Sequence, residues 1–385
     1  MPWRTNSLVE QRLKLVHAMM QRKVTVAALC RDAGVSRQTA YKYVARYHQG
    51  GVGGLKDQSR ANDREPAGSN YRSKILMLRR AYPTWGARKL IYRLKVLEGQ
   101  SEVLPKERTV QRWLHEAGYA VRTKRRRHGH RLVHSPVRVE GCNDLWTVDF
   151  KGWFLTQSGV QVQPLTVRDH YSKYLLTTEP VRSLHEKVIR KCFERLFAKY
   201  GVPKAILTDK GSPFCGSGPH GLTRLSAWWH RLGIQVLFVD RKNGINNNAH
   251  EQMHQVMKKE VAKSPARTWP KQVQALEAWR RRYNEVRPHE AIGLKTPQRL
   301  YRPKPTKEFK VAPLIYPPTW KSYVVKSSGH IILNRCIHGI GRAFAGLPIG
   351  LEPIGPTTYR VYFGTLVIGE ITPKDSSTRT SKTVT

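Results

Sequence analysis

The segment from residue 140 to residue 302 constrains the fold more than any other part of the chain, because short strands and helices alternate along it. Runs rich in β-branched and aromatic residues predict three antiparallel strands, with turns at Ser158-Gly159 and His170-Tyr171-Ser172. The expected elements are strands over 144–154, 160–171, 173–181, 204–208 and 234–239, and helices over 184–200, 222–232, 271–283 and from about residue 247. This order favours an α/β domain with a mixed sheet.

The first 60 residues show helical spacing with one sharp break. Apolar residues are spaced as in an amphipathic helix over 7–21, and two shorter helices are predicted over 26–33 and 37–47. Gly34 permits a tight turn between the last two, and Ser36 is placed to cap the second. The pattern is typical of a helix-turn-helix DNA-binding domain, although an ordinary helical hairpin has the same spacing. The expected DNA-facing residues are Arg37, Gln38, Thr39, Tyr41 and Lys42.

A second helical domain is predicted over 71–122, after a glycine-rich and polar stretch over 50–70 that indicates a flexible connection. Its helices are expected over 71–81, 86–97 and 107–117, and the last pair again resembles a helix-turn-helix. The exposed candidates for DNA contact are Arg108, Gln111 and Arg112. Because one such unit covers only a few base pairs, two units favour a bipartite DNA site.

The charge of the chain favours a polyanionic partner. Its 68 Lys and Arg outnumber 27 Asp and Glu, giving a formal net charge of +41. A short packaging protein has such a charge, but 39% hydrophobic residues and ten tryptophans allow this chain to form hydrophobic cores, so we expect several domains that bind nucleic acid. A basic linker is predicted over 123–139, either lying along a phosphate backbone or simply solvated. Its cationic residues are Lys124, Arg125, Arg126, Arg127, Arg131 and Arg138.

Cysteine usage and hydropathy indicate the compartment. The five cysteines are scattered and form no CxxC pair, so neither a disulfide framework nor a zinc module is predicted. No run of about 18 apolar residues is present, so no membrane association is expected. We therefore expect a soluble, cytoplasmic and nucleoid-associated protein in a reducing compartment.

The C-terminal part has a different pattern. Short β-like runs separated by glycines over 313–373 predict a small SH3-like β-barrel of about five strands. The residues from 374 to 385 are rich in Ser, Thr and Lys and are expected to be disordered.

Three carboxylates stand out in the α/β segment. Asp149 lies within an apolar strand, where an unpaired carboxylate costs several kcal/mol; Asp209 lies at a strand tip, and Glu251 in the first turn of a helix. Each has an ordinary explanation: a buried arginine partner for Asp149, a turn cap for Asp209 and a helix-dipole charge for Glu251. Asp169 and Asp240 are alternatives for the third position, and Asp169 is better interpreted as a turn residue.

Taken together, the three carboxylates predict a metal site. Three carboxylates can hold two divalent cations, and such hard oxygen ligands suit Mg²⁺ or Mn²⁺ better than zinc. Carboxylates that bind cations within a cationic chain are what a metal-dependent enzyme acting on nucleic acid requires.

The order of motifs resembles a known family. WTVDFKGWF, VRDHYSKYLL, LTDKGSPF, HEQMHQVMKKE and YNEVRPHEAIGLKTP are similar, in order and spacing, to the core of bacterial insertion-sequence transposases of the retroviral-integrase superfamily. The resemblance spans about 140–302 and implies an RNase H-like catalytic core whose DDE triad falls on Asp149, Asp209 and Glu251. It also implies two-metal phosphodiester hydrolysis and strand transfer, with transposon ends and target as double-stranded DNA partners and a homo-oligomer assembled on DNA.

The chain departs from the family pattern near the expected site. Lys210 replaces the usual asparagine after the second aspartate, and could either pair with a ligand carboxylate or contact a phosphate; Asn248 stands where glycine is usual. Lys258 and Lys259 are candidates for DNA backbone contact. His250 and His254 are expected in the groove or, more simply, on the surface, and Trp228 and Trp229 in packing.

Two other functions compete with transposition. A repurposed transposase would bind DNA sequence-specifically without cleaving it. An RNase H-like nuclease acting on structured nucleic acid would cleave without strand transfer, and the two DNA-reading domains argue against it.

Overall fold

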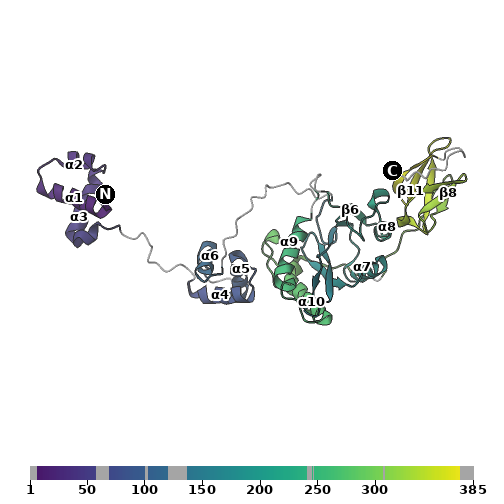
Figure 1. The fold of residues 1–385 in the computed structure, drawn as a ribbon, viewed down its shortest axis with the longest axis horizontal. Helices are drawn as coiled ribbons and strands as arrows, with labels where there is room; N and C mark the ends of the chain where they lie inside the picture. The colour runs from purple at the N-terminus through teal and green to yellow at the C-terminus, as the bar shows by residue number, and fades with distance from the viewer. Residues whose placement is uncertain are drawn as a thin grey trace. The chain divides into compact units, whose positions relative to one another are not determined.

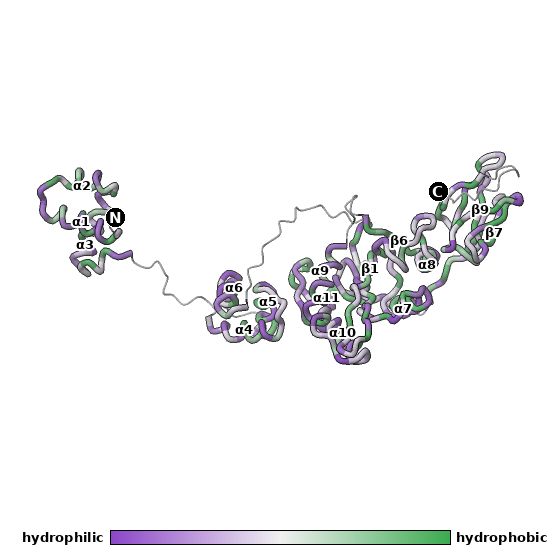
Figure 2. The backbone as a smooth tube through the Cα atoms, viewed as in Figure 1, coloured by the Kyte–Doolittle hydropathy of each residue, from purple (hydrophilic) through white to green (hydrophobic). Residues whose placement is uncertain are grey.

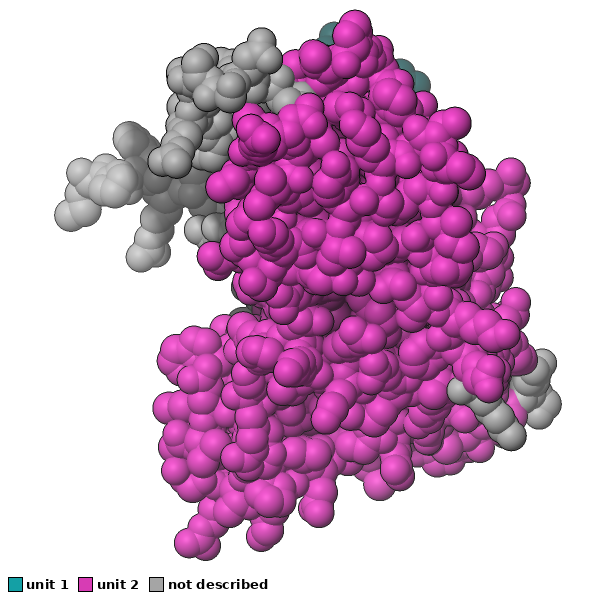
Figure 3. Space-filling view, turned by 90° about the vertical axis from the view of Figure 1, so that its right-hand side faces the viewer, with its two compact units in different colours: residues 1–66 teal, residues 67–385 magenta. Residues whose placement is uncertain are grey.

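A computed structural model describes residues 7–57, 69–99, 103–119, 137–240, 245, 247–306 and 308–372. It divides into two compact units, residues 1–66 and residues 67–385, which are coloured separately in Figure 3. Hydrophobic and hydrophilic stretches alternate along both units (Figure 2). The two units are described separately.

The first unit is a three-helix domain with the predicted break. Its helices are α1 (Leu8–Gln21), α2 (Val26–Asp32) and α3 (Arg37–Gly50). Ser36 caps α3 as predicted, because its hydroxyl accepts the backbone N–H of Thr39 at 3.1 Å. The expected flexible connection is wrong at its start: residues 51–55 form a 3₁₀ helix, η1 (Gly51–Leu55), whose Leu55 is fully buried. Arg12 fixes this turn by donating to the Leu55 carbonyl at 2.7 Å.

The second unit begins with a small helical domain. After η2 (Ser69–Tyr71), the predicted helices are confirmed as α4 (Arg72–Ala81), α5 (Ala87–Glu98) and α6 (Glu107–Glu116) (Figure 1). Their apolar faces share one core that includes Ile75, Leu90 and Trp113.

A mixed α/β domain follows, as predicted from the alternation of strands and helices. Its strands are β1 (Leu145–Phe150), β2 (Phe154–Leu155), β3 (Gln161–Asp169), β4 (Leu175–Val181), β5 (Ala205–Thr208) and β6 (Gln235–Phe238). They form one sheet in the order β2-β3-β1-β5-β6, with β4 paired to β3. β1 is antiparallel to β3 and parallel to β5, so β1 lies in the middle of the sheet.

Helices cover both faces of this sheet. The helical segments of the domain are α7 (Glu186–Tyr200), η3 (Pro219–Gly221), α8 (Arg224–Arg231), α9 (Asn248–Met257), a π-helical turn η4 (Lys258–Ala262), α10 (Trp269–Glu285), η5 (Glu290–Ile292) and α11 (Pro297–Leu300). On one face α7 and α8 pack over Trp146 and Val148 of β1. On the other face α9 and α10 pack over Val162 and Leu175. Successive strand residues point to opposite faces, so Thr147 and Asp149 point toward the α9 side.

The C-terminal domain is antiparallel but is not the closed barrel predicted for residues 313–373. Its elements are β7 (Lys321–Val324), β8 (His330–Leu333), β9 (Cys336–Gly339), η6 (Arg342–Phe344), β10 (Pro348–Pro353), β11 (Tyr359–Phe363) and β12 (Leu366–Ile371). They form a four-stranded sheet, β12-β11-β10-β7, and a separate hairpin, β8-β9. The predicted number of strands is close to the observed number. Closure into a barrel was not predictable, because it requires strands of the two sheets to pair with each other, and residue spacing along the chain does not specify that pairing.

Other expectations concern cysteines and membranes. All five cysteines are free thiols, which agrees with the absence of a predicted disulfide framework. Within the described residues, no helix has the length and apolar character needed to cross a membrane. The predicted disordered tail, residues 374–385, lies outside the described residues.

Candidate active site

Asp149 is the most buried of the three predicted carboxylates. It lies near the end of β1, opposite Thr166 of β3, and its side chain is 23% exposed. Burial is the largest cause of a rise in the Asp149 pKa, from 3.8 to about 7, and the nearby carboxylates of Asp209 and Glu251 raise it further. Among the described residues Asp149 forms no ion pair with an arginine, so the buried arginine partner that would have explained it as a structural residue is absent there. The side chain beside it is instead His254, whose Nδ1 lies 3.5 Å from Asp149 Oδ2.

Asp209 follows β5 directly and is exposed at the strand tip. Gly211 lies against its carboxylate: a Cβ built on Gly211 would meet Asp209 Oδ2 at 3.0 Å. A side chain at position 211 would therefore press on this carboxylate, so the glycine leaves the space around it open. Lys210, the departure from the family pattern, is exposed beside it.

Glu251 is exposed in the first turn of α9. It is close enough to Asp149 to raise the pKa of that carboxyl, yet no three His, Cys, Asp or Glu side chains among the described residues are grouped tightly enough to hold a metal ion. These two observations are compatible, because two carboxylates repel each other over distances longer than those at which they can bind the same metal ion. The three carboxylates therefore converge on one region without sharing a coordination sphere.

Two buried histidines connect α9 to the strand that carries Asp149. His250 is fully buried; its Nδ1 lies 2.9 Å from the Thr147 hydroxyl and its Nε2 lies 2.7 Å from the Thr166 hydroxyl. His254 Nε2 lies 2.8 Å from the same Thr166 hydroxyl, which itself donates to the Asp149 carbonyl at 2.8 Å. The expectation of surface histidines is therefore wrong.

Burial decides the protonation state of this histidine pair. Desolvation lowers the pKa of His254 to about 3, and the pKa of His250 well below its ordinary value, so both rings are neutral at neutral pH. A neutral His254 gives Asp149 no positive charge. The sequence carried a signal for this arrangement, since His250 and His254 are one helical turn apart and face one side of α9.

The remaining sequence candidates in the core have ordinary structural roles. Asp169 is a turn residue as expected, accepting the backbone N–H groups of Asn143 and Ser172, each at 2.8 Å. Asp240 follows β6, and its backbone bridges to Ile245. Trp228 and Trp229 are buried in the core between α7 and α8, which confirms their packing role.

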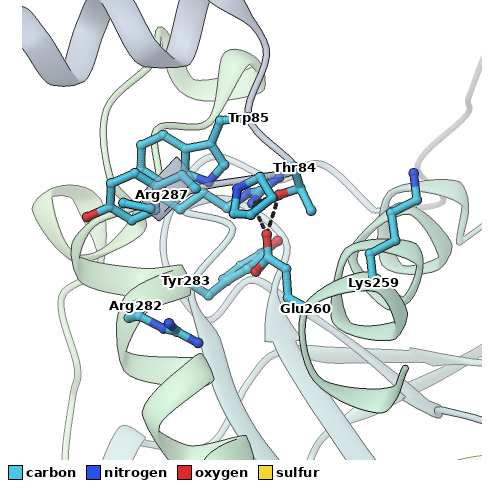
Figure 4. Close-up of a pocket in the computed structure, with 10 residues that line it drawn as sticks. Thr84, Trp85, Lys259, Glu260, Arg282, Tyr283 and Arg287 are labelled. Atoms are coloured by element: carbon cyan, nitrogen blue, oxygen red, sulfur yellow. Dashed lines mark hydrogen bonds and ion pairs between the residues drawn. The ribbon is translucent and has the colours of Figure 1, made fainter. Parts of the chain in front are cut away.

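A cavity of about 190 Å³ lies where the α4–α5 turn meets the core, lined by Tyr82, Thr84, Trp85 and Glu260 among others (Figure 4). Glu260 accepts the indole N–H of Trp279 at 2.7 Å and a guanidinium N–H of Arg287 at 3.0 Å, and the Thr84 hydroxyl also donates to it. The DNA-contact candidates Lys258 and Lys259 are both exposed, and Lys259 also lines this cavity. Sequence reasoning missed Glu260 and Arg287, because only the fold brings them together.

The two candidate DNA-reading helices expose most of the predicted residues. On α3, Arg37, Gln38, Tyr41 and Lys42 are exposed, while Thr39 is half-buried with its hydroxyl 2.9 Å from Ser36 Oγ. On α6 the three exposed candidates are Arg108, Gln111 and Arg112. Gln111 donates to Glu107 at 3.0 Å, and Arg112 pairs with Glu116 at 3.6 Å. In the basic linker, Lys124, Arg125, Arg126, Arg127 and Arg131 lie outside the described residues.

Family models match three parts of the chain. An integrase core domain matches residues 232–297, a helix-turn-helix domain matches residues 11–63, and a homeodomain-like domain matches residues 39–114. The integrase match contains Glu251 and α10, but neither Asp149 nor Asp209.

Curated relatives come from bacterial insertion elements. An uncharacterized 31.7 kDa protein of insertion element IS407 from Burkholderia multivorans is 26% identical over 207 residues, covering 53% of this chain and 72% of that protein. An uncharacterized 39.2 kDa protein of IS476 from Xanthomonas euvesicatoria is 24% identical over 152 residues, covering 39% of this chain and 42% of that protein.

Solved structures give weaker likenesses. The HTLV-2 integrase catalytic core domain in complex with magnesium (trimeric form) matches with 14% identity and a TM-score of 0.34, covering 43% of this chain and 100% of that chain. A chain of the simian T-cell lymphotropic virus intasome in complex with PP2A regulatory subunit B56 gamma matches with 15% identity and a TM-score of 0.38, covering 78% and 100%. The family models and the insertion-element relatives, rather than these structures, show what the chain is similar to: it contains helix-turn-helix domains and an integrase core domain, and it resembles the IS407 and IS476 insertion-element proteins.

Proposed function

We propose that this protein is a transposase that binds the ends of its insertion element and cleaves and joins DNA at a site formed by Asp149, Asp209 and Glu251. One observation carries the proposal. Asp149 is a largely buried carboxylate near two further carboxylates and a neutral histidine. Among the described residues no lysine or arginine forms an ion pair with it, and Lys151, the smallest of the named influences on its pKa, offsets its charge only in part. Divalent cations supply such compensation.

The donor set fits Mg²⁺ or Mn²⁺. Its members are carboxylates from the middle strand, a neighbouring strand tip and a helix start, and hard oxygen ligands suit these ions. Because like charges repel, three carboxylates without a cation stay apart, and we expect cation binding to draw Asp209 and Glu251 toward Asp149. Asp149, Asp209 and Glu251 would hold two such ions, which when bound would supply a water nucleophile at neutral pH and stabilise the leaving oxygen.

The protein's own residues position DNA and carboxylates for this reaction. The Thr166 hydroxyl and His254 hold the end of β1, so Asp149 keeps a fixed orientation. The space beside Gly211 lets Asp209 face the reacting phosphate. The exposed residues of α3 and α6 bind the element ends, and joining two ends to target DNA requires a multimer assembled on DNA.

Cleavage of end DNA tests the proposal. A duplex containing the inverted repeat that flanks the gene is incubated with the protein in Mg²⁺ or Mn²⁺, and nicking at the element end is followed. Wild type is expected to nick, and Asp149→Ala to lose nicking while still binding the duplex. The proposal fails if wild type binds the repeat without metal-dependent nicking and Asp149→Ala changes nothing.

A second function, sequence-specific DNA binding without cleavage, is favoured by one observation: the described carboxylates are not grouped for metal binding. The same nicking assay separates the two functions. A repurposed binding protein would protect the repeat from nuclease digestion as well as its Asp149→Ala variant does, with no product in either metal.

A further inference from the structure

Arg168 is a buried arginine of β3 that contacts the start of α9. It lies directly opposite Thr147 in the pairing of β3 with β1, so both side chains point to the α9 side of the sheet. The two contact successive helical residues: Arg168 Nη1 donates to the Ala249 carbonyl at 2.8 Å, and the Thr147 hydroxyl lies 2.9 Å from His250 Nδ1. Glu251 is the next residue, so both contacts hold the turn that carries it.

The Arg168 guanidinium has few partners in its buried position. The residue is 3% exposed, and its Nε and Nη2 atoms are buried without a hydrogen-bond partner in the described chain. The neighbouring acid, Asp169, points to the other face of the strand, where its carboxylate accepts the backbone N–H groups of Asn143 and Ser172. Burying a charge is costly unless a partner of opposite charge compensates it, so Arg168 is an expensive residue at this position.

The place of this charge is unfavourable as well. The first turn of a helix presents unpaired N–H groups and the positive end of the helix dipole, which favours acidic side chains and disfavours cations. Arg168 brings a cation to that end of α9. An apolar side chain of similar length would fill the same space without either cost. Fold stability alone therefore does not explain the arginine, and its one hydrogen bond points to the start of α9.

The start of α9 has no cap of its own. Asn247, the residue before the helix, makes no side-chain capping hydrogen bond within the described chain. Its backbone carbonyl accepts the N–H groups of His250 and Glu251 at 2.8 and 3.0 Å. Because an uncapped first turn opens more readily, a bond from the sheet to Ala249 adds support where the helix lacks it.

We propose that Arg168 is a positioning residue that holds the first turn of α9 against β3, and so places the Glu251 carboxylate for metal binding. The fold is less stable with this charge than with an apolar side chain, and the gain is the position of one ligand. This inference rests on the proposed function and adds to it a residue that touches neither the metal nor DNA.

Two measurements on the full chain test this role. Hydrogen exchange of the metal-free protein, followed by mass spectrometry over residues 248–253, reports how firmly the first turn is held. Arg168→Met keeps an unbranched stem but removes the donor, and should speed this exchange about fivefold because one hydrogen bond is lost. Mn²⁺ titration by electron paramagnetic resonance, with the terminal-repeat duplex present, should show binding weakened about tenfold, as expected when a metal ligand loses its support.

Arg231→Met is the matched control. Arg231 also donates to a backbone carbonyl, that of Ala312 at 3.3 Å, and its buried Nε has no hydrogen-bond partner among the described residues. It lies on α8, which covers the opposite face of the sheet, so its loss should leave both the exchange of α9 and Mn²⁺ binding unchanged. Arg168→Lys keeps a donor of similar reach and should restore both to within about threefold of wild type.

Thermal denaturation separates positioning from a structural role. Arg168→Met should melt at the wild-type temperature or above it, because an apolar side chain replaces a buried cation. A lower melting temperature would show that the guanidinium stabilises the fold, and would overturn the proposal.

The outcomes also separate this inference from the proposed function. If wild type binds Mn²⁺ and nicks the repeat, yet Arg168→Met matches Arg231→Met in exchange and in Mn²⁺ binding, Arg168 is not a positioning residue and the transposase proposal stands. If wild type neither binds Mn²⁺ nor nicks, the catalytic proposal falls. Faster exchange in Arg168→Met would then still show that Arg168 supports α9, and equal exchange would overturn that support as well.

Discussion

Replacing Asp149 with asparagine should stabilise the metal-free protein at neutral and alkaline pH. The folded state raises the pKa of this carboxyl from 3.8 to about 7, because burial and two neighbouring carboxylates disfavour its charge. Ionising Asp149 therefore costs folding free energy. The amide keeps the size of the side chain and carries no charge.

The sign and size of this stability change follow from the linkage between proton binding and folding. Below about pH 4 the carboxyl is neutral in both folded and unfolded states, so the substitution changes little. As the pH rises through 3.8 toward 7, the unfolded state loses its proton first and wild type loses stability. Above pH 7 the loss levels off at an upper limit of about 4 kcal/mol, which Asp149→Asn should recover.

Urea denaturation of the full chain in EDTA, followed at about pH 5 and about pH 8, measures this difference. Glu285→Gln is the control, because it removes an exposed carboxylate from α10 of the same domain. We expect Asp149→Asn to gain stability over wild type at the higher pH, to gain much less at the lower pH, and to lose DNA nicking. A variant that is less stable than wild type at about pH 8 would refute the electrostatic reasoning.

Three further predictions concern neighbouring features. Glu260→Ala leaves Arg287 buried without its carboxylate and should cost about 3 kcal/mol, measured by thermal denaturation against Glu285→Gln; an equal melting temperature for the two would contradict it. Gly211→Ala should fold normally but lose about tenfold in nicking rate, because its Cβ would lie 3.0 Å from Asp209 Oδ2, whereas Gly152→Ala, with open space around it, should not; equal rates would exclude crowding. Ser36→Ala removes the cap of α3 and should cost about 1 kcal/mol, seen as faster hydrogen exchange at Thr39 and Ala40; unchanged exchange would argue against the cap.

Local features were predictable from the sequence. The helix starting after Ser36, the strand that carries Asp149 and the helix that carries Glu251 all follow from spacing and capping, which act between residues close in the chain. The turn role of Asp169 was predictable for the same reason.

Features that depend on distant residues were not predictable. The spacing of His250 and His254 predicts that they face one side of α9, but their burial depends on β3, whose Thr166 hydroxyl lies within hydrogen-bond distance of both rings. Glu260 meets Thr84 and Arg287 only after three separate segments fold together. Closure of the C-terminal sheet depends likewise on strand partners, and the domain boundaries and the roles of Asp149, Asp209 and Glu251 stay predictions.

Direct counting of bound metal tests the central claim best. Electron paramagnetic resonance titration with Mn²⁺, in the presence of the terminal-repeat duplex, should detect two bound ions per active site in wild type. Asp149→Asn, Asp209→Asn and Glu251→Gln should each lose at least one of them, while Glu285→Gln keeps both. Unchanged Mn²⁺ binding in all three site variants would show that these carboxylates do not form a metal centre.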